Sequence, residues 1–191
     1  MITHINLCST HAWRVELRSP IVFHPGYNVV VGPNATGKST LLEALHGCHD
    51  CQRQINGKTR CHYFNSETMN PHRDDKRFRG IKGSIIKVRA MFSSHGETMR
   101  DVMHAIQLQP GDCFLLDEPE AGHDLDWIVK IRQGLDMLVR RKCQLIVASH
   151  HPVFWKNAHV IELKKNYLNR MLVKYQMQLN NHPRHEKCKK M

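Results

Sequence analysis

The string GPNATGKST, residues 32–40, constrains this chain more than any other stretch. It matches the pattern G-x-x-x-x-G-K-[ST], follows the β-branched run YNVVV, and precedes STLLEALHG, which reads as a helix closed by Gly47. A strand, a glycine-containing turn and a helix in this order gather backbone N–H groups and a helix N-terminus around one point. The sequence therefore predicts a phosphate-binding loop; the alternative, a chance match in a turn, does not account for this context.

Each part of the loop has an expected role. Gly32 and Gly37 let the backbone curl so that its N–H groups face inward. Lys38 is expected to reach the β- and γ-phosphates of a nucleotide, and Ser39 to offer its hydroxyl to Mg²⁺. The nucleotide-binding set predicted here is Gly32, Pro33, Asn34, Ala35, Thr36, Gly37, Lys38, Ser39 and Thr40.

The segment CFLLDEPE supplies two carboxylates directly after a short apolar run. Such a run is typical of a strand buried in a parallel sheet, and ligands of open α/β sheets bind beyond the carboxyl ends of the strands. Asp117 is therefore a candidate ligand of Mg²⁺, and Glu118 is a candidate to polarise an attacking water. Solvated charges at a strand end are the alternative, which the neighbouring phosphate loop disfavours.

The remaining elements predict an α/β fold with a mainly parallel sheet flanked by helices and an antiparallel β patch at the N-terminus. WRVELR and IVFH read as early strands, CHYF and QLIVAS as later ones, and LDWIVKIRQGLDMLVRRK as a helix. IKGSIIKVRAMF and ETMRDVMHAIQL also look helical, whereas HVIELKKNYLNRMLVKYQ reads as a strand hairpin. Residues 1–178 are expected to form one domain and residues 179–191 a flexible basic tail.

Composition limits the partners. The chain has 191 residues and a net charge of +11, which fits either contact with DNA or RNA or simply a basic surface that keeps the protein in solution. No apolar run is long enough to span a membrane, and no signal peptide is apparent, so we expect a cytoplasmic protein.

The seven cysteines suggest free thiols rather than a disulfide framework. Cys48, Cys51 and Cys61-His62 have spacings that would suit zinc, and a second group, HPRHEKC, lies near the C-terminus. Because no second C-x2-C pair completes the pattern, the sequence favours ordinary loop residues over a metal site.

The order of four motifs, GPNATGKST, SSHGE, LLDEPEAGHD and IVASHHP, resembles that of ABC-type P-loop ATPases. By this resemblance Ser94, Gly96 and Glu97 form a signature motif inside a reduced helical part at about residues 66–109. Asp124 matches the aspartate of the D-loop. His150 matches the γ-phosphate sensor of the switch region, although its neighbour His151 is an alternative.

The resemblance implies an ATPase, an NTP hydrolase acting on acid anhydrides, with ATP and Mg²⁺ bound between two copies of the chain. Lys38, Glu118 and His150 would be its catalytic residues. The signature motif would contact the γ-phosphate held by the other copy, so hydrolysis would release a homodimer and switch a partner effector.

Only 56 positions separate Lys38 from Ser94, which is short for a transporter subunit and leaves no room for a coiled coil. The chain therefore looks most like compact ATPases of the SMC/RecF-like AAA branch. We expect it to act in a nucleic-acid transaction such as DNA repair, or in a mobile-element or defence system. The energising subunit of a membrane transporter is the alternative, and a regulatory module with little turnover is a third.

Two family features have no clear position. Glu67 or Asn65 could supply the polar contact of the Q-loop to Mg²⁺ or water. An adenine-stacking ring could come from Trp13 or His11, but Trp13 would equally suit the core.

Overall fold

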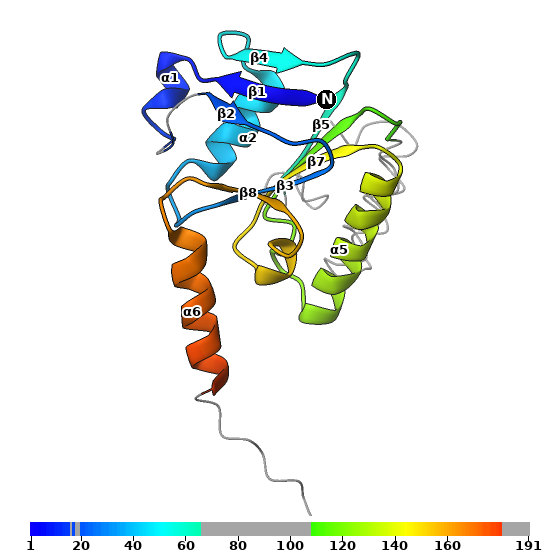
Figure 1. Cartoon of the computed structure of the whole chain (residues 1–191). Coiled ribbons are helices and arrows are strands. Elements are labelled where there is room, and N and C mark those ends of the chain that lie inside the picture. The colour runs from blue at the N-terminus through cyan, green and yellow to red at the C-terminus, as the bar shows by residue number, and fades with distance from the viewer. Residues whose placement is uncertain (16, 18–19, 66–107, 181–191) are drawn as a thin grey trace, which may run out of the picture.

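The structure is a computed structural model that describes residues 1–15, 17, 20–65 and 108–180. Two sheets form its framework (Figure 1): a five-stranded parallel sheet in the order β5-β6-β7-β3-β8, and a three-stranded antiparallel sheet in the order β2-β1-β4. The predicted α/β architecture, with a parallel sheet and an N-terminal antiparallel patch, is confirmed.

The described elements have the following bounds. The parallel strands are β3 (Tyr27–Val31), β5 (Cys61–Asn65), β6 (Cys113–Asp117), β7 (Gln144–Ala148) and β8 (His159–Glu162). The antiparallel strands are β1 (Ile2–Asn6), β2 (Ile21–Val22) and β4 (Gln52–Ile55). The helices are α1 (Ser9–Ala12), α2 (Lys38–Gly47), α5 (Leu125–Arg140), α6 (Tyr167–Asn180) and the 3-10 helix η2 (Pro152–Phe154).

The three central strands β3, β6 and β7 are buried along their whole length, as their continuous apolar runs predict. Successive side chains point to opposite faces, so β3 sends Val29 and Val31 toward the α5 side and Val30 toward the α2 side. On the α2 side the apolar cluster continues into the antiparallel sheet through Ile2 and Ile5. Helix α2 is therefore packed between the two sheets, with its N-terminus at the carboxyl end of β3.

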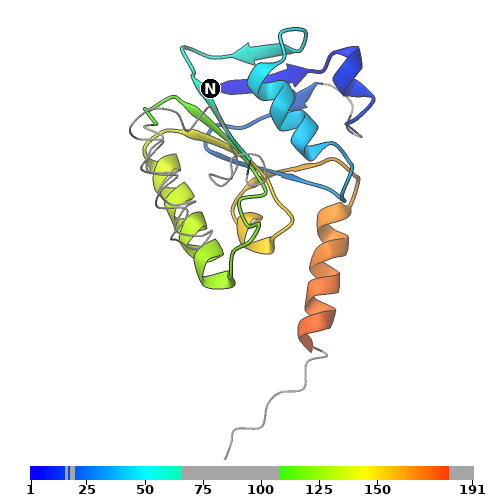
Figure 2. The same ribbon diagram turned by 180° about the vertical axis from the view of Figure 1, so that it is seen from behind.

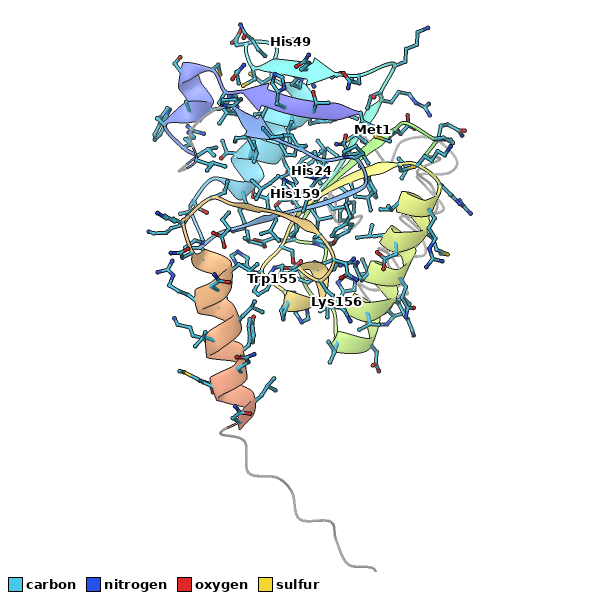
Figure 3. The ribbon with its side chains drawn as sticks, in the orientation of Figure 1. Met1, His24, His49, Trp155, Lys156 and His159 are labelled. Carbon is cyan, nitrogen blue, oxygen red and sulfur yellow. The ribbon has the colours of Figure 1, made fainter. Side chains whose placement is uncertain are left out.

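A buried amide fixes the antiparallel sheet to the parallel one. The side chain of Gln144, the first residue of β7, accepts from the backbone N–H of Ile2 at 2.7 Å and donates to the carbonyl of Ile2 at 2.7 Å and of His24 at 3.0 Å. His24 in turn stacks its ring on His159 of β8, with the centroids 3.6 Å apart (Figure 3). Buried polar groups are costly unless paired, so this set of bonds holds the two sheets in one arrangement.

The strand predicted for WRVELR is wrong over its described residues. The chain instead makes a helical turn: α1 ends at Ala12, and the backbone N–H groups of Arg14 and Val15 both donate to the carbonyl of His11, at 3.1 and 3.2 Å. These local bonds satisfy the backbone without a neighbouring strand, and they leave Trp13 exposed while Val15 is buried. The alternation of apolar and polar side chains in this segment therefore does not correspond to a strand.

The hairpin predicted for residues 159–176 is also wrong in its second half. Strand β8 is followed by helix α6, which projects from the body of the protein (Figure 2). Glu162 starts this helix, because its carboxylate accepts from the backbone N–H groups of Asn166 and Leu168, both at 2.9 Å. Asn166 makes the turn with a φ of 58°. Capping of orphan N–H groups thus outweighs the β-like composition of the segment.

Several smaller expectations have mixed outcomes. The predicted strand at CHYF is present as β5, whereas the polar edge strand β4 was not anticipated. Helix α6 ends at Asn180, beyond the domain boundary placed after residue 178. The helices predicted for IKGSIIKVRAMF and ETMRDVMHAIQL, and with them the helical part at 66–109, fall almost wholly outside the described residues. None of the helices that the structure describes is long and apolar enough to cross a membrane.

Candidate functional site

The loop between β3 and α2 has the conformation that its glycines permit. Gly37 caps α2 with a φ of 90°, and a Cβ atom at this position would lie 2.4 Å from the carbonyl oxygen of Arg14. A side chain at Gly32 would likewise meet the hydroxyl of Thr36 at 2.6 Å, while Thr36 itself donates to the carbonyl of Pro33 at 2.8 Å. The backbone is therefore wound tightly, with the N-terminus of α2 at its centre.

Lys38 folds back over this loop. Its ammonium group donates to the carbonyl oxygens of Gly32, at 3.4 Å, and Pro33, at 3.3 Å. Burial lowers the pKa of Lys38, while Glu118 and Asp117 oppose this change by their negative charge. A buried cation with only long hydrogen bonds to carbonyl oxygens is suited to an anionic ligand, which would compensate its charge more fully.

Asp117 lies at the carboxyl end of β6 and is 1% exposed. Its Oδ2 atom accepts from the amide of Asn65 at 2.9 Å and from the hydroxyl of Tyr63 at 3.2 Å. Burial raises the pKa of Asp117, and hydrogen bonds from Ser39, Tyr63 and Asn65 oppose that rise. Its Oδ1 atom is buried and lacks a conventional hydrogen bond to any residue that the structure describes.

The Asp117 carboxylate lies beside Ser39, which belongs to the first turn of α2. A carboxylate oxygen and a serine hydroxyl are hard oxygen ligands of the kind that Mg²⁺ binds beside phosphate groups. The residues present thus fit the predicted magnesium site. Asn65, one of two candidates for a further polar contact, reaches this site through Asp117, whereas the other candidate, Glu67, lies outside the described residues.

Glu118 follows in an unusual backbone conformation, with a φ of 48°. For a residue other than glycine this left-handed region costs about 1–3 kcal/mol, and such strain clusters at functional sites. The strain aims the Glu118 carboxylate at the pocket rather than into the sheet: its Oε1 atom lies 3.6 Å from Nε2 of His150, and its side chain is 37% exposed. The backbone N–H of Glu118 is tied to the carbonyl of Ala148 at 2.9 Å.

His150 follows strand β7 and faces Glu118. Its Nδ1 atom lies 3.4 Å from the hydroxyl of Tyr167, the first residue of α6. Burial lowers the pKa of His150, and the positive charge of Lys38 lowers it further, so the imidazole is neutral at physiological pH. If Tyr167 donates to Nδ1, then Nε2 carries the proton and points toward Glu118.

His151 and Asp124 have local structural partners instead. Nδ1 of His151 accepts from the backbone N–H of Val153 at 3.3 Å and so caps η2. Asp124 accepts from the backbone N–H of Trp127 at 2.9 Å and caps α5. The geometry favours His150 over His151 as the residue that senses a ligand, and it gives Asp124 a capping role within this chain.

Lys38, Glu118 and His150 line one pocket of about 1030 Å³ at the N-terminus of α2. Trp13 and Arg14 form one edge of it; the Trp13 side chain is 73% exposed, and the Arg14 guanidinium lies 4.9 Å from its ring centroid. Trp13 is therefore not a core residue. The full lining comprises Trp13, Arg14, Asn34, Ala35, Gly37, Lys38, Ser39, Thr40, Glu118 and His150.

A family model described as AAA domain matches residues 10–110, which is more than half of the chain. The chain belongs to the AAA domain family. No curated protein matches it. The match begins in α1 and includes the loop of this AAA domain, the edge formed by Trp13 and Arg14, and the predicted signature region.

Solved structures show that this AAA domain has the fold of ABC-type ATPases. A metal-chelate-type ABC transporter in an inward-facing conformation matches with a TM-score of 0.53 and 15% identity, covering 78% of this chain and 72% of that one. The ATP-binding cassette MJ0796, in a dimeric post-hydrolysis state bound to ADP and Pi, matches with a TM-score of 0.52 and 17% identity, covering 77% and 85%.

A third match is the model of ribosome-bound archaeal Pelota and ABCE1, with a TM-score of 0.47 and 19% identity. The match covers 75% of the present chain, which spans only 29% of the length of that relative.

The sequence motifs did not identify Glu120 of the AAA domain as a residue of the site. Its Oε1 atom accepts from the hydroxyl of Ser149, at 2.8 Å, and from the backbone N–H of His150, at 2.7 Å. Glu120 thereby fixes the backbone that carries the sensor candidate, although burial raises its pKa. The sequence shows a carboxylate three residues after Asp117. It does not show that this carboxylate contacts residues 29 and 30 positions further along the chain. The signature candidates Ser94, Gly96 and Glu97 lie outside the described residues.

The proximity of Lys38 and His150 gives a test of this arrangement. Replacing Lys38 by Met removes a positive charge and should raise the pKa of His150 toward the ordinary value of about 6.5. NMR titration would follow the imidazole, assigned by its loss in His150→Gln. Lys58→Met, on an exposed loop, should leave the pKa of His150 unchanged. An unaltered pKa in Lys38→Met would contradict the proximity.

The sign of the stability effect follows from the same shift. Because the pKa of His150 is lower in the folded chain, the unfolded chain binds more protons as the pH drops below the ordinary histidine value. The contribution of His150 therefore makes the free energy of unfolding decrease as the pH falls through that window, and His150→Gln should lessen the decrease.

Proposed function

We propose that the chain is a Mg²⁺-dependent ATPase that pairs with a second copy around two ATP molecules and so switches a partner effector. The observation that carries the proposal is the single pocket that joins the phosphate loop and Lys38 to Glu118 and His150. Membership of the AAA domain family and the ABC-type fold support nucleotide binding.

Binding of the triphosphate uses the positive end of α2, the curled loop and Lys38. Ser39 and the unpaired Oδ1 atom of Asp117 would hold Mg²⁺ beside it, where the ion offsets the negative charge of the phosphates. Trp13 and Arg14 lie at the outer edge of the pocket, where the ring can stack on a base and the guanidinium can contact phosphate or sugar.

Glu118 has the position of the residue that orients and deprotonates water. Its carboxylate is partly exposed to the pocket, and it lies beside a neutral imidazole that can donate from Nε2. His150 is then placed to contact the γ-phosphate or the same water, while Lys38 stabilises the charge that develops on the transferring group. Tyr167 contacts the imidazole of His150, and Glu120 holds the backbone N–H of the same residue.

Pairing of two copies is proposed because of the resemblance of Ser94, Gly96 and Glu97 to a signature motif. A helix N-terminus with a serine hydroxyl and a glycine N–H forms an anion site that would serve the nucleotide of the other copy. Asp124, exposed at the start of α5, is available to a partner through the carboxylate oxygen that does not cap the helix. The related cassette MJ0796 is described as dimeric.

Direct contact of this chain with DNA or RNA is proposed because its net charge of +11 favours polyanions, and the effector that it switches would serve the same nucleic-acid transaction. A compact ATPase of the SMC/RecF-like kind would use ATP-dependent pairing to open or close a binding surface. The role in a membrane transporter has less support, since a neighbour at 15% identity shows the fold alone.

Glu118→Gln tests hydrolysis and pairing together. The amide keeps the shape of the carboxylate but cannot accept a proton, so ATP should bind without turnover and hold the two copies together. Light scattering after gel filtration should give a dimer mass with saturating ATP and Mg²⁺, and a monomer mass without nucleotide. Glu43→Gln, an exposed change in α2, is the control and should behave as the original chain. A Glu118→Gln variant that stays monomeric would contradict the shared site.

Trp13→Ala tests the assigned base contact. Stacking of a base on an aromatic ring is worth about 1–3 kcal/mol, so the variant should bind ATP roughly tenfold more weakly, and Trp13→Phe should retain most of the affinity. Isothermal titration with a non-hydrolysable analogue gives the two dissociation constants. A Trp13→Ala variant that binds the analogue as tightly as the original chain would remove Trp13 from the binding site.

Salt dependence tests the nucleic-acid partner. If Lys and Arg side chains neutralise phosphates, the affinity for DNA or RNA should fall steeply as the salt concentration rises, because counterions are released on binding. Fluorescence anisotropy with labelled oligonucleotides, repeated with and without ATP, measures this slope. Binding that is absent, or insensitive to salt, would exclude nucleic acid as a direct partner.

A further inference from the structure

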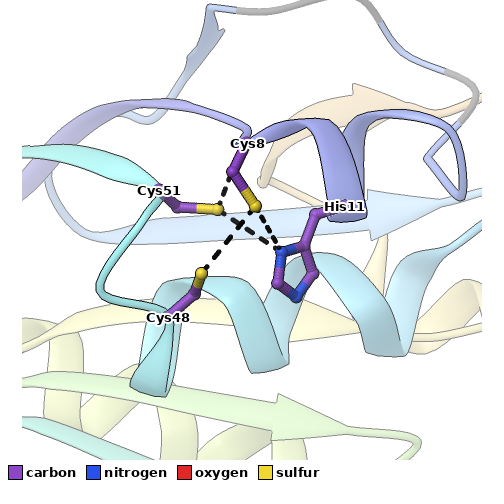
Figure 4. A group of neighbouring side chains, drawn as sticks. All are labelled: Cys8, His11, Cys48 and Cys51. Carbon is purple, nitrogen blue, oxygen red and sulfur yellow. Dashed lines mark hydrogen bonds between the residues drawn. The ribbon is translucent and has the colours of Figure 1, made fainter.

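Four side chains of metal-binding type meet at the end of α2 that lies away from the phosphate loop. They are Cys8, His11, Cys48 and Cys51 (Figure 4), and their ligand atoms all lie within 4.8 Å of one another. Two segments far apart in the sequence bring them together. Cys8 is the N-cap of helix α1 and His11 lies within it, whereas Cys48 caps the C-terminus of α2 and Cys51 directly precedes β4.

The spacing within each segment is that of a metal-binding pair. Two residues separate Cys8 from His11, and two separate Cys48 from Cys51. Short spacings of this kind, supplied twice, are typical of structural zinc sites with three thiolates and one imidazole. The sequence alone suggests the pair Cys48 and Cys51 together with Cys61. In the structure Cys61 lies elsewhere, opposite Cys113 in the β5–β6 register. The other histidine- and cysteine-containing segment, residues 182–188, is outside the described part of the chain.

Two of the distances between the ligand atoms are close to those of a tetrahedron. Zinc binds sulfur at about 2.3 Å and nitrogen at about 2.0–2.1 Å, so two ligand atoms on one ion lie roughly 3.5–3.8 Å apart. The sulfur atoms of Cys8 and Cys48 are 3.9 Å apart, and Sγ of Cys51 is 3.6 Å from Nδ1 of His11. Sγ of Cys8 is nearer to Nδ1 of His11, at 3.0 Å, which a small side-chain rotation would correct.

The surroundings suit thiolates. The backbone N–H of Cys8 donates to Sγ of Cys51 at 3.3 Å, a type of outer contact that stabilises the charge on a metal-bound sulfur. Cys51 is 4% exposed, Cys8 and Cys48 are half-buried against the apolar cluster that contains α2, and His11 is half-buried. All four described ligands come from the protein, so no coordination position is left for a substrate.

We propose that Cys8, His11, Cys48 and Cys51 bind a structural zinc ion that ties α1 to the C-terminal end of α2. The donor set excludes magnesium and calcium, which prefer oxygen, and three thiolates with an imidazole suit zinc better than an iron–sulfur cluster with four cysteines. This proposal replaces the view of these cysteines as ordinary loop residues. It also explains why His11, a candidate for adenine stacking, turns toward sulfur atoms instead.

The ion would position the outer edge of the nucleotide pocket. Trp13 follows α1 directly, and the carbonyl of Arg14 packs against Gly37. An anchor at Cys8 and His11 therefore restrains the residues that line this edge. That consequence rests on the proposed nucleotide site, whereas the metal site itself does not, and metal content and nucleotide affinity are measured separately.

Metal analysis of the full chain, purified without chelators, tests the site. The protein should contain about one zinc per chain, as one closed four-ligand set requires. Cys48→Ser should lose the zinc, and Cys61→Ser, a half-buried cysteine outside the cluster, should keep it. His11→Cys should also keep it, because a fourth thiolate replaces the imidazole, whereas His11→Ala should not.

A cobalt titration keeps the test decisive if a variant fails to fold. Original protein freed of metal and given Co²⁺ should develop the visible absorption of a tetrahedral cobalt–thiolate site, and added zinc should abolish it. A chelator strong enough to remove zinc should lower the thermal midpoint of the original protein. Protein that contains no zinc and gives no cobalt spectrum, or that contains iron instead, would overturn the proposal, as would zinc retained by Cys48→Ser.

Discussion

The buried carboxylate of Asp117 is the constraint on which the site depends. It is 1% exposed at the end of a wholly buried strand, where burial alone would favour its neutral form. Asn65 and Tyr63, both on β5, donate to Oδ2, whereas Oδ1 is buried without a hydrogen bond to any residue that the structure describes. The order of β5 and β6 in the sheet therefore determines which oxygen is available to a cation. The ammonium group of Lys38 partly compensates the negative charge of Asp117. The site therefore presents a carboxylate that can bind a cation and an ammonium group that can bind a polyanion.

The second constraint is the close packing of two backbone segments that the sequence does not show to be neighbours. The carbonyl of Arg14 lies where a side chain at Gly37 would be, so the turn after α1 and the phosphate loop form one surface. The helical turn at His11 to Val15 makes this approach possible, and an extended strand there would carry Trp13 away from the pocket. The phosphate loop is thus packed against the turn after α1, whose residues belong to no recognised sequence motif.

The sequence predicted those parts of the fold whose signals are local. The runs YNVVV, CFLLD and QLIVA are buried on both faces, and the helix after the loop follows from residues within one turn of each other. Such local patterns do not predict contacts between residues that are far apart in the sequence. Glu120 reaches Ser149, Gln144 reaches Ile2, and Cys8 reaches Cys48, each across many positions. The errors at Trp13 to Val15 and in α6 arose because hydrogen bonds accepted by the His11 carbonyl and the Glu162 carboxylate outweighed side-chain alternation.

Helix α2 connects the two chemistries of the chain. Its N-terminus begins at Lys38 under the phosphate loop, and its C-terminus is capped at Cys48 beside the group of sulfur atoms. Between them, the apolar residues Leu41, Leu42 and Leu45 are fully buried between the sheets. A short helix whose apolar face is buried transmits displacement of one end to the other, because close-packed interiors have few alternative arrangements. A restraint at Cys48 and Cys51 would therefore also limit how far the phosphate loop can move.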